Sequence, residues 1–75
     1  MTVLTFGRIV DICGAGVLDV APQPDTDSLE AHLHGRYPEL KGLTYVLAVD
    51  QKTITGNTPL HPSSVVAVLP PFSGG

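Results

Sequence analysis

The sequence has little that could form a disulfide or a metal site: one cysteine, Cys13, and three histidines among 75 residues. A single cysteine excludes a disulfide within the chain. Because it lies in an apolar stretch, where a lone cysteine is usually a small core residue, we assign Cys13 no role. His32 and His34 would point to different sides of a helix, and His61 lies far along the chain. We therefore expect three surface histidines and no metal site.

Basic residues are also scarce, and no long apolar run is present. Four basic against seven acidic residues give a net charge of −3, which leaves no patch to neutralise phosphates, so nucleic acid is not an expected partner. The sequence has no apolar run of membrane-spanning length and no basic region followed by an apolar core at its start. We therefore expect a cytoplasmic protein with no membrane partner.

What the chain does have is enough apolar residues for one small domain. At 43% hydrophobic and 15% charged residues, it has the composition of a folded rather than a disordered protein. Its length leaves little room for a deep enzyme pocket, which favours a role that depends on a partner. The predicted elements are a strand at residues 2–6, a helical turn or two within 7–14, and strands at 17–21, 43–49, 53–55 and 65–69, with one main helix after residue 26.

The first helix has an alternative interpretation, and the last strand carries a prediction about burial. Residues 9, 12 and 13 have the spacing of a helical face, although residues 3–10 could instead form one longer strand. Val65–Leu69 is apolar throughout, which predicts a central strand buried on both faces. Asp50, Gln51 and Lys52 read as the turn before the short strand. One sheet with one main helix predicts an α+β two-layer domain.

The main helix has clear start and stop signals. Asp27 followed by Glu30 resembles a capping box, with Thr26 as an alternative cap. Pro38 disfavours helical geometry at the residue before it, so the helix should end near Arg36. An apolar stripe at spacings of four would face the sheet and consists of Leu29, Leu33 and Tyr37.

The last seven residues read Leu69-Pro70-Pro71-Phe72-Ser73-Gly74-Gly75. Two consecutive glycines add nothing to a core, but they make the narrowest backbone available for threading a channel in another protein. Pro70 and Pro71, which precede the two glycines, favour a semi-rigid extended spacer. We therefore expect a folded domain at 1–69 and an extended tail at 70–75 whose terminal carboxylate, on Gly75, is the working group.

The chain resembles the small subunit of molybdopterin synthase, within the ubiquitin-like sulfur-carrier family. The resemblance covers nearly the whole chain, and its most specific part is the terminal sequence just quoted. The other similar segments are residues 3–6, 46–51 and 58–60. It implies a β-grasp fold, with one mixed sheet of four to five strands packed on one main helix.

The resemblance also implies a chemical cycle at Gly75. An adenylyltransferase that resembles ubiquitin-activating enzymes would adenylate the carboxylate with ATP, and a sulfur donor would convert it to a thiocarboxylate. The large synthase subunit, which holds the catalytic residues, would then use two such carriers to build the dithiolene of molybdopterin from cyclic pyranopterin monophosphate. The chain would thus be a non-catalytic, sulfur-donating subunit of a heterotetramer, with no cofactor bound to the isolated chain.

The roles implied for the tail follow from this cycle. Gly74 would let the backbone approach the nucleotide and later the pterin. Phe72 would anchor the base of the tail in a partner groove, or else pack on its own sheet. Pro70 and Pro71 would set the direction of the tail, and Ser73 would contact the partner.

Two segments depart from the family pattern. Many members have arginine and glutamate in the first short helix, where this chain has Val10 and Asp11, with Arg8 two residues earlier. Many also have an acidic turn before the last strand, where this chain reads Pro62-Ser63-Ser64-Val65, so steering toward a basic partner would be weaker. Two alternatives stay open: a sulfur carrier for thiazole, cysteine or tRNA thiolation, and a ubiquitin-like modifier or binding module.

Overall fold

The structure, a computed structural model, describes residues 1–71. In chain order the elements are β1 (Thr2–Thr5), α1 (Arg8–Cys13), β2 (Val17–Asp19), α2 (Thr26–Arg36), the 3-10 helix η1 (Pro38–Gly42), β3 (Val46–Val49), β4 (Lys52–Thr53) and β5 (Val65–Leu69). The predicted short helix is confirmed as α1, and the alternative of one longer strand over residues 3–10 is wrong. No helix in the described part of the chain is long and apolar enough to cross a membrane.

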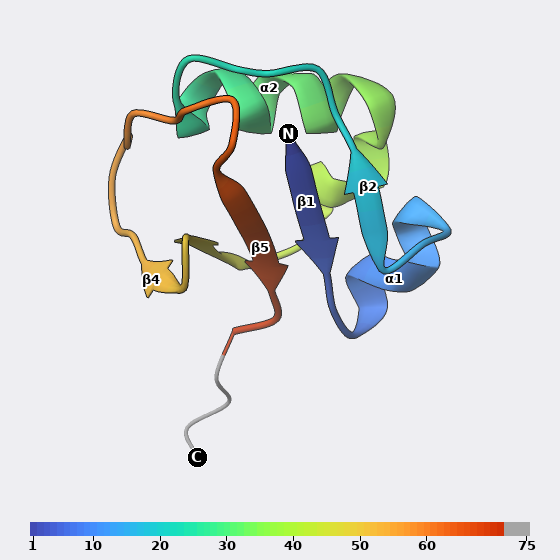
Figure 1. Ribbon diagram of the computed structural model, residues 1–75. Helices are drawn as coiled ribbons and strands as arrows, with labels where there is room; N and C mark the ends of the chain where they lie inside the picture. Colours follow the sequence, from blue (N-terminus) through green and yellow to red (C-terminus); the bar gives the residue numbers. More distant parts are fainter. Residues whose placement is uncertain (72–75) are drawn as a thin grey trace.

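The five strands form one mixed sheet in the order β2-β1-β5-β3-β4 (Figure 1). The first and last strands of the chain, β1 and β5, run parallel at its centre, with Thr2 opposite Val65 and Thr5 opposite Val68. The other pairs are antiparallel. A mixed five-stranded sheet with one main helix is the β-grasp arrangement, and the predicted α+β class is confirmed. The division into a domain at 1–69 and a tail at 70–75 stays a prediction.

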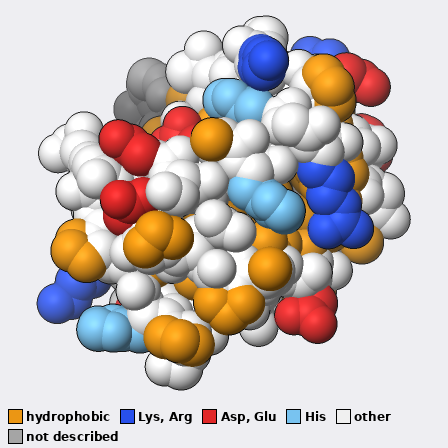
Figure 2. All heavy atoms as spheres, turned by 90° about the horizontal axis from the view of Figure 1, so that it is seen from above, with side chains coloured by type: hydrophobic (Ala, Val, Ile, Leu, Met, Phe, Trp, Pro, Cys, Tyr) orange, Lys and Arg blue, Asp and Glu red, His pale blue; other side chains and the backbone are white. Residues whose placement is uncertain are grey.

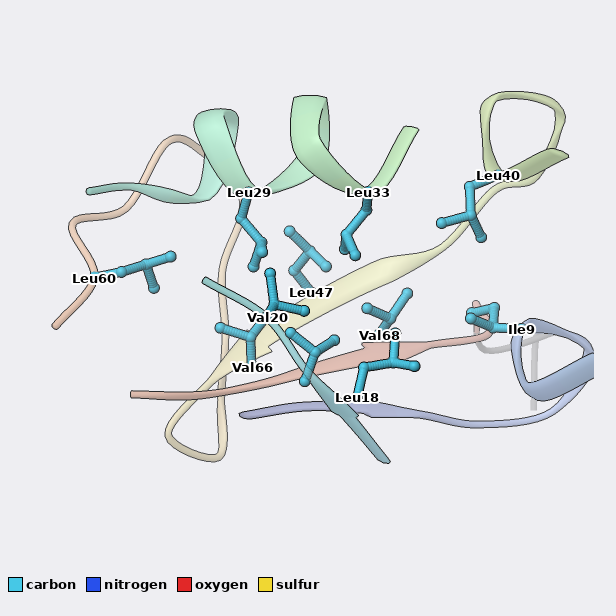
Figure 3. Close-up of a cluster of buried hydrophobic side chains, with 11 residues drawn as sticks. Ile9, Leu18, Val20, Leu29, Leu33, Leu40, Leu47, Leu60, Val66 and Val68 are labelled. Carbon is cyan, nitrogen blue, oxygen red and sulfur yellow. The ribbon is translucent and has the colours of Figure 1, made fainter. Parts of the chain in front are cut away.

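The hydrophobic core lies between α2 and one face of this sheet (Figure 3). Leu29 and Leu33 point from α2 toward Val66 and Val68 of β5, and all four are at most 3% exposed. The core is completed by Val3, Ile9, Leu18, Val20, Leu40, Leu47 and Leu60. The predicted stripe is therefore confirmed: both leucines are buried, and Tyr37, the C-cap of the helix, is half-buried and packs against the same core.

The prediction that β5 is buried on both faces is wrong. Val66 and Val68 are buried, but Val65 is 37% exposed and Ala67 is half-buried. Alternate residues of a strand point to opposite faces, and only one face of this sheet is covered by α2. The continuous apolar run thus marks a central strand, as expected, but in a sheet with one open face.

Several strand boundaries differ from the predictions, and at the start of β3 a local hydrogen bond is the cause. β3 begins at Val46 rather than Leu43, since the Leu43 N–H donates to the carbonyl of Leu40 and closes η1. The sequence pattern does not predict η1, because a proline at position 38 indicates only the end of the preceding helix. β2 ends at Asp19, although the Val20 N–H still donates to the carbonyl of Met1 at 2.9 Å.

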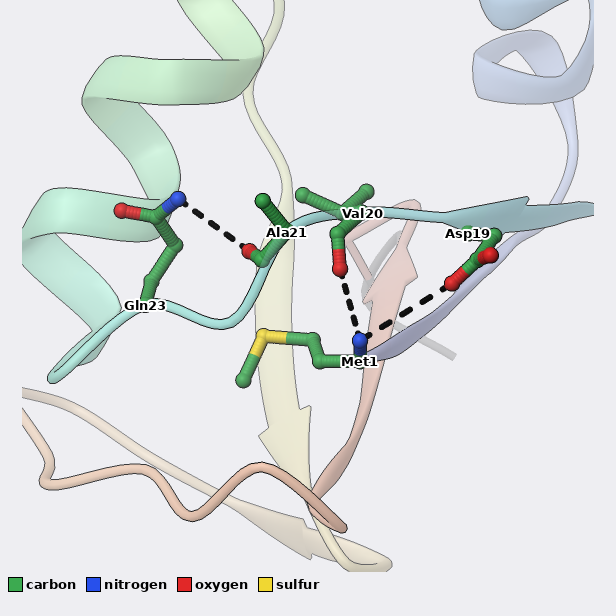
Figure 4. Close-up of polar contacts among 5 residues, drawn as sticks. All are labelled: Met1, Asp19, Val20, Ala21 and Gln23. Carbon is green, nitrogen blue, oxygen red and sulfur yellow. Dashed lines mark hydrogen bonds and ion pairs between the residues drawn. The ribbon is translucent and has the colours of Figure 1, made fainter.

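The one ion pair found within residues 1–71 lies where β1 begins beside the end of β2, and it joins Met1 to Asp19 (Figure 4). The Met1 ammonium nitrogen lies 2.6 Å from the carbonyl oxygen of Val20 and 3.9 Å from the Asp19 carboxylate. Asp19 is fully exposed, so this pair adds little stability. In the following loop, the Gln23 side-chain amide donates to the carbonyl of Ala21.

The start of α2 differs from the prediction: the N-cap is Asp25, not Asp27 or Thr26. The Asp25 carboxylate accepts from the Ser28 N–H at 2.9 Å. The side chain of Asn57, about 30 residues away, accepts from the Asp27 N–H at 2.9 Å. Thr26 is buried and bonds the Thr58 backbone through both its own N–H and its hydroxyl oxygen. The helix is therefore capped partly by a distant loop, which local sequence patterns do not reveal.

Stability should depend on the charge of Asp25. The hydrogen bonds that its carboxylate accepts from Ser28, followed by the one from Asn57, lower the pKa of Asp25. A lowered pKa in the folded state means that the stabilisation is present above the unfolded value of about 3.9 and is lost as pH falls through the lower folded value. The variant Asp25→Asn keeps an acceptor oxygen but no charge. In urea unfolding, we expect the free energy of unfolding of wild type to exceed that of this variant at pH 7, and the difference to shrink as the pH falls through the lowered pKa of Asp25; a constant difference would contradict the prediction.

The β3–β4 hairpin turns through Asp50 and Gln51 only, because Lys52 already pairs with Val49 in β4. Both turn residues have positive φ, 48° and 72°, a conformation that glycine adopts more readily than any residue with a Cβ. The Asp50 carboxylate holds the turn against β5 by accepting from the Val65 N–H at 2.9 Å. The predicted turn was one residue too long, and β4 therefore starts one residue earlier than expected.

Replacing Gln51 with glycine should stabilise the protein. The exposed Gln51 side chain makes no hydrogen bond within residues 1–71, so little is lost. Relief of the left-handed backbone strain should raise the free energy of unfolding by about 0.5–1 kcal/mol, after the greater entropy of unfolded glycine is subtracted. Chemical denaturation checks this. A decrease in stability would show that the turn is not strained.

Candidate functional site

The predicted functional residues lie in the tail, and the structure describes only two of them. Pro70 and Pro71 follow β5 directly and are exposed. Phe72, Ser73, Gly74 and Gly75 lie outside the described residues, so the roles given to them stay predictions. The described part of the site is therefore the base of the tail and the surface around it.

The base of the tail lies at one end of the sheet, beside the turn that follows β1. Because β1 and β5 are parallel and in register, both strands leave the sheet at the same end (Figure 1). The chain leaves β1 through Phe6 and Gly7 and leaves β5 through Pro70 and Pro71. Phe6, whose side chain is 43% exposed, thus lies at the end of the sheet from which the tail departs.

The face of the sheet opposite α2, which we call the open face, is largely apolar. Strand alternation and register place its residues opposite one another: Leu4 with Ala67, Ala67 with Ala48, and Leu69 with Val46. A hollow of 310 Å³ lies on it, lined by Leu4, Asp50, Gln51, Val65 and Ala67. An apolar sheet surface beside the base of the tail is suited to contact another protein.

A second, more polar groove of 650 Å³ runs between α2 and the segment around β3 and β4. It holds a chain of hydrogen bonds in which the Tyr45 hydroxyl donates to the Glu30 carboxylate at 3.2 Å. The Nε2 atom of His34 lies 2.6 Å from the same hydroxyl oxygen, and because the hydroxyl hydrogen is already used, Nε2 is the donor. Burial, followed by the charge and hydrogen bond of Glu30, raises the pKa of Tyr45 to about 12. The three side chains thus satisfy one another's hydrogen bonds, and the Tyr45 hydroxyl keeps its proton.

The histidines and the cysteine lie mostly as expected. His32 and His61 are exposed, but His34 is half-buried in the polar groove, which corrects the expectation of three surface histidines. Burial raises the pKa of the Cys13 thiol more than nearby Arg36 lowers it, which disfavours the reactive thiolate. Within residues 1–71, no group of three or more His, Cys, Asp or Glu residues is placed to hold a metal ion.

The two departures from the family pattern have structural outcomes. Arg8 takes part in no ion pair within the described residues, where the one pair is that of Met1 and Asp19. The turn before β5 is held by Ser64, whose buried hydroxyl oxygen accepts from the His61 N–H at 2.9 Å. The surface seen from above in Figure 2 carries interspersed acidic, basic and histidine side chains, without one continuous basic patch.

The sequence patterns did not predict the role of Gly7 in the turn after β1, or the hydrogen bonds of Tyr45 and Asn57 with α2. Only Gly7 had a local signal, since a glycine between a strand and a helix often marks a turn with positive φ, and its φ is 60°. Tyr45 and Asn57 act through contacts with α2 that span many residues of sequence. A single sequence carries no signal for such contacts.

The fold and the exposed base of the tail define a class: a small ubiquitin-like β-grasp domain. Within that class, residues 3–75 match the ThiS family. The chain therefore belongs to the ThiS family of ubiquitin-like sulfur carriers.

Three solved structures are similar over 99% of this chain. Two are small archaeal modifier protein 1, from Methanosarcina acetivorans (TM-score 0.84, 94% of that chain) and Haloferax volcanii (TM-score 0.74, 97% of that chain), both 20% identical. At that identity they show the fold alone. The third is a complex of subunits 1 and 2 of molybdopterin-converting factor from Helicobacter pylori 26695 (TM-score 0.70, 28% identity, 96% of that chain).

Proposed function

We propose that this chain is the sulfur-carrier subunit of a molybdopterin synthase and that Gly75 carries the sulfur. The observation that carries the proposal is the family match, which extends through the terminal diglycine at residue 75. The 28% identity to a chain of the Helicobacter pylori molybdopterin-converting factor complex favours molybdopterin over other thiolation pathways.

The proposed cycle activates a carboxylate, which is a weak electrophile by itself. A carboxylate oxygen of Gly75 attacks the α-phosphorus of ATP, and the bond to pyrophosphate breaks. The sulfur donor then delivers sulfide to the carbonyl carbon, and the C–O bond to AMP breaks, which leaves a thiocarboxylate. In the large subunit its sulfur attacks a carbon of the pterin precursor, and the bond from that carbon to an oxygen substituent breaks. Water then attacks the carbonyl carbon of the resulting thioester, and its C–S bond breaks, which leaves the sulfur on the product and restores the carboxylate.

The proposed partners follow from this cycle. An adenylyltransferase that resembles ubiquitin-activating enzymes uses ATP, and a large subunit supplies the catalytic residues, in an expected heterotetramer. The isolated chain holds no cofactor. The open face supports docking to these partners, because it is apolar and lies beside the base of the tail. Pro70 and Pro71 direct the tail, and Phe72 and Ser73 contact the partner.

Mass spectrometry of the carboxyl-terminal peptide tests the proposal. The chain is incubated with ATP, a sulfide source and the cognate activating enzyme, and the mass gain from replacing one oxygen by sulfur is located from fragment ions. Fragment ions are required because oxidation of Met1 or Cys13 gives a similar mass. The loaded carrier is then mixed with the large subunit and cyclic pyranopterin monophosphate, and conversion to molybdopterin is measured.

Each outcome assigns the chain to a class. Sulfur on Gly75 with conversion of the precursor supports the proposal in full. Sulfur on Gly75 without conversion, given an active large subunit, leaves a carrier for thiazole, cysteine or tRNA thiolation. Gly75 in an isopeptide bond to lysine would identify a modifier, and an unmodified terminus with an active enzyme would overturn the carrier function.

Truncation of Phe6 should weaken partner binding more than it weakens the fold. Exposed aromatic residues at the centre of protein contacts often contribute about 2 kcal/mol or more, so Phe6→Ala should raise the Kd for the activating enzyme by roughly 30-fold. Calorimetric titration measures this. His32→Ala, an exposed change on α2, is the control and should leave the Kd unaltered. Equal affinities for wild type and Phe6→Ala would place the docking surface elsewhere.

A further inference from the structure

Pro70, the first residue of the tail, lies directly over Gly7. A methyl group placed on Gly7 would lie 3.4 Å from Cγ of Pro70, 3.8 Å from its Cβ and 3.9 Å from its Cδ. All three of the nearest atoms belong to this one ring. Both residues are exposed, so the contact is not a by-product of core packing.

The topology of the sheet produces this contact. Thr5 lies opposite Val68, the last pair of the parallel β1–β5 ladder. Two residues further along each strand are Gly7 and Pro70, so the turn after β1 and the base of the tail meet at the same level of the sheet. Any change that moves this turn would therefore move the surface against which the tail starts.

The backbone at position 7 suits glycine alone. Gly7 has φ 60° and ψ −136°, a region that residues with a Cβ rarely adopt. This conformation turns the chain from β1 into α1, where the Val10 N–H donates to the Gly7 carbonyl at 3.2 Å. The side of Gly7 that would carry a side chain is therefore left bare, and it is the side that Pro70 covers.

We propose that Gly7 is a positioning residue for the tail: a methyl group would just fill the space between it and the ring of Pro70, so the absence of a larger side chain lets that ring keep its place and sets the direction in which Pro70 and Pro71 leave the sheet. The proposal rests on the proposed function, since direction matters only if Gly75 must reach a reaction centre on a partner. A tail that starts in the right direction loses less conformational freedom when it enters the partner. It also brings the carboxylate into reacting geometry more often.

The consequence is a separation of binding from turnover. The open face does not include position 7, but Phe6 is the neighbouring residue, so a side chain at position 7 should weaken docking only as far as it shifts Phe6. The tail, however, would start in another direction, and the carboxylate would reach the nucleotide less often. Altering Gly7 should therefore lower kcat for adenylation and raise the Kd of the complex less than Phe6→Ala does.

Gly7→Val tests this, with Gly14→Val as the matched control. Valine fills two of the three staggered positions on its Cβ, so it cannot easily turn away from Pro70. Gly14 also has positive φ, 78°, in the milder left-handed region, and no atom lies within 4 Å of a methyl group placed there. It therefore controls for replacing a positive-φ glycine without the neighbouring ring, and the greater strain at position 7 is separated by a double-mutant cycle. We expect Gly7→Val to lower kcat for ATP-dependent adenylation roughly tenfold, with a smaller rise in Kd than Phe6→Ala gives, and Gly14→Val to change kcat less than about twofold.

A double-mutant cycle with Pro70→Ala separates contact from strain. Once the ring is removed, adding Gly7→Val should reduce kcat by no more than about twofold, because the nearest atom, Cγ, is gone together with Cδ, and only Cβ at 3.8 Å remains. The unaltered chain provides a second measurement in case Gly7→Val does not fold. Nuclear Overhauser effects between the Gly7 α-protons and the Pro70 ring protons should be present in solution.

Equal losses of kcat in Gly7→Val and Gly14→Val, additive effects in the cycle, or missing Overhauser effects would each overturn the proposal. Failure of the proposed function has a different signature. In that case, the wild-type chain itself is not adenylated by an active enzyme, while the Overhauser effects between Gly7 and Pro70 are still observed.

Discussion

Deletion of Gly75 is expected to abolish sulfur loading, with the rate of adenylation falling by at least about 10³-fold. One residue of extended chain spans roughly 3.5 Å, so the carboxylate of the truncated chain would stop that far short of the α-phosphorus of ATP. A misplacement of about 1 Å can already cost 100-fold in rate, because the reacting atoms must approach within about 3–3.5 Å. Single-turnover formation of the acyl adenylate with the cognate activating enzyme measures the effect.

Two comparisons make this deletion informative. Gly75→Ala keeps the length of the chain and adds only a methyl group, so its rate should fall between those of wild type and the deletion. The Kd of the truncated domain for the enzyme should remain within about tenfold of wild type, because the open face is unaltered. A truncated chain that is adenylated at the wild-type rate would show that Gly75 is not the reacting residue.

The fold was predictable because its strongest determinants are local in the sequence. The apolar run at β5, the spacing of Leu29 and Leu33, and the proline after α2 each act within a few residues. The error at β5 has the same origin. A run of consecutive apolar residues identifies a central strand but does not say whether a second layer covers its other face.

The base of the candidate site was less predictable, because it depends on which strands become neighbours. The sequence identified Pro70 as a residue that sets the direction of the tail. It could not show that Gly7 lies beneath that ring, since the parallel pairing of β1 with β5 joins residues more than 60 positions apart. The capping of α2 by Asn57 was missed for the same reason. The family resemblance supplied the chemistry of Gly75, and the described residues add the surface from which it would act.

That surface depends on a small core centred on α2. Leu29 is 0% exposed and lies on the helix face that covers Val66 and Val68 (Figure 3). With only 75 residues, the whole domain is expected to have a free energy of unfolding of about 4–11 kcal/mol. The loss of one large buried side chain is therefore a substantial fraction of the total.

Leu29→Ala should lower the free energy of unfolding by about 3 kcal/mol and the melting temperature by about 10–20 °C. The loss combines the transfer of the removed methyl groups with the cavity left between α2 and β5. Chemical and thermal denaturation measure it, and the more exposed Val17→Ala, whose parent side chain is 63% exposed, is the control, expected to stay within about 0.5 kcal/mol of wild type. Sulfur loading should fall in Leu29→Ala only near its lower melting temperature, because the tail and the open face are unaltered below it. A loss below 1 kcal/mol would mean that α2 is not the main cover of the core.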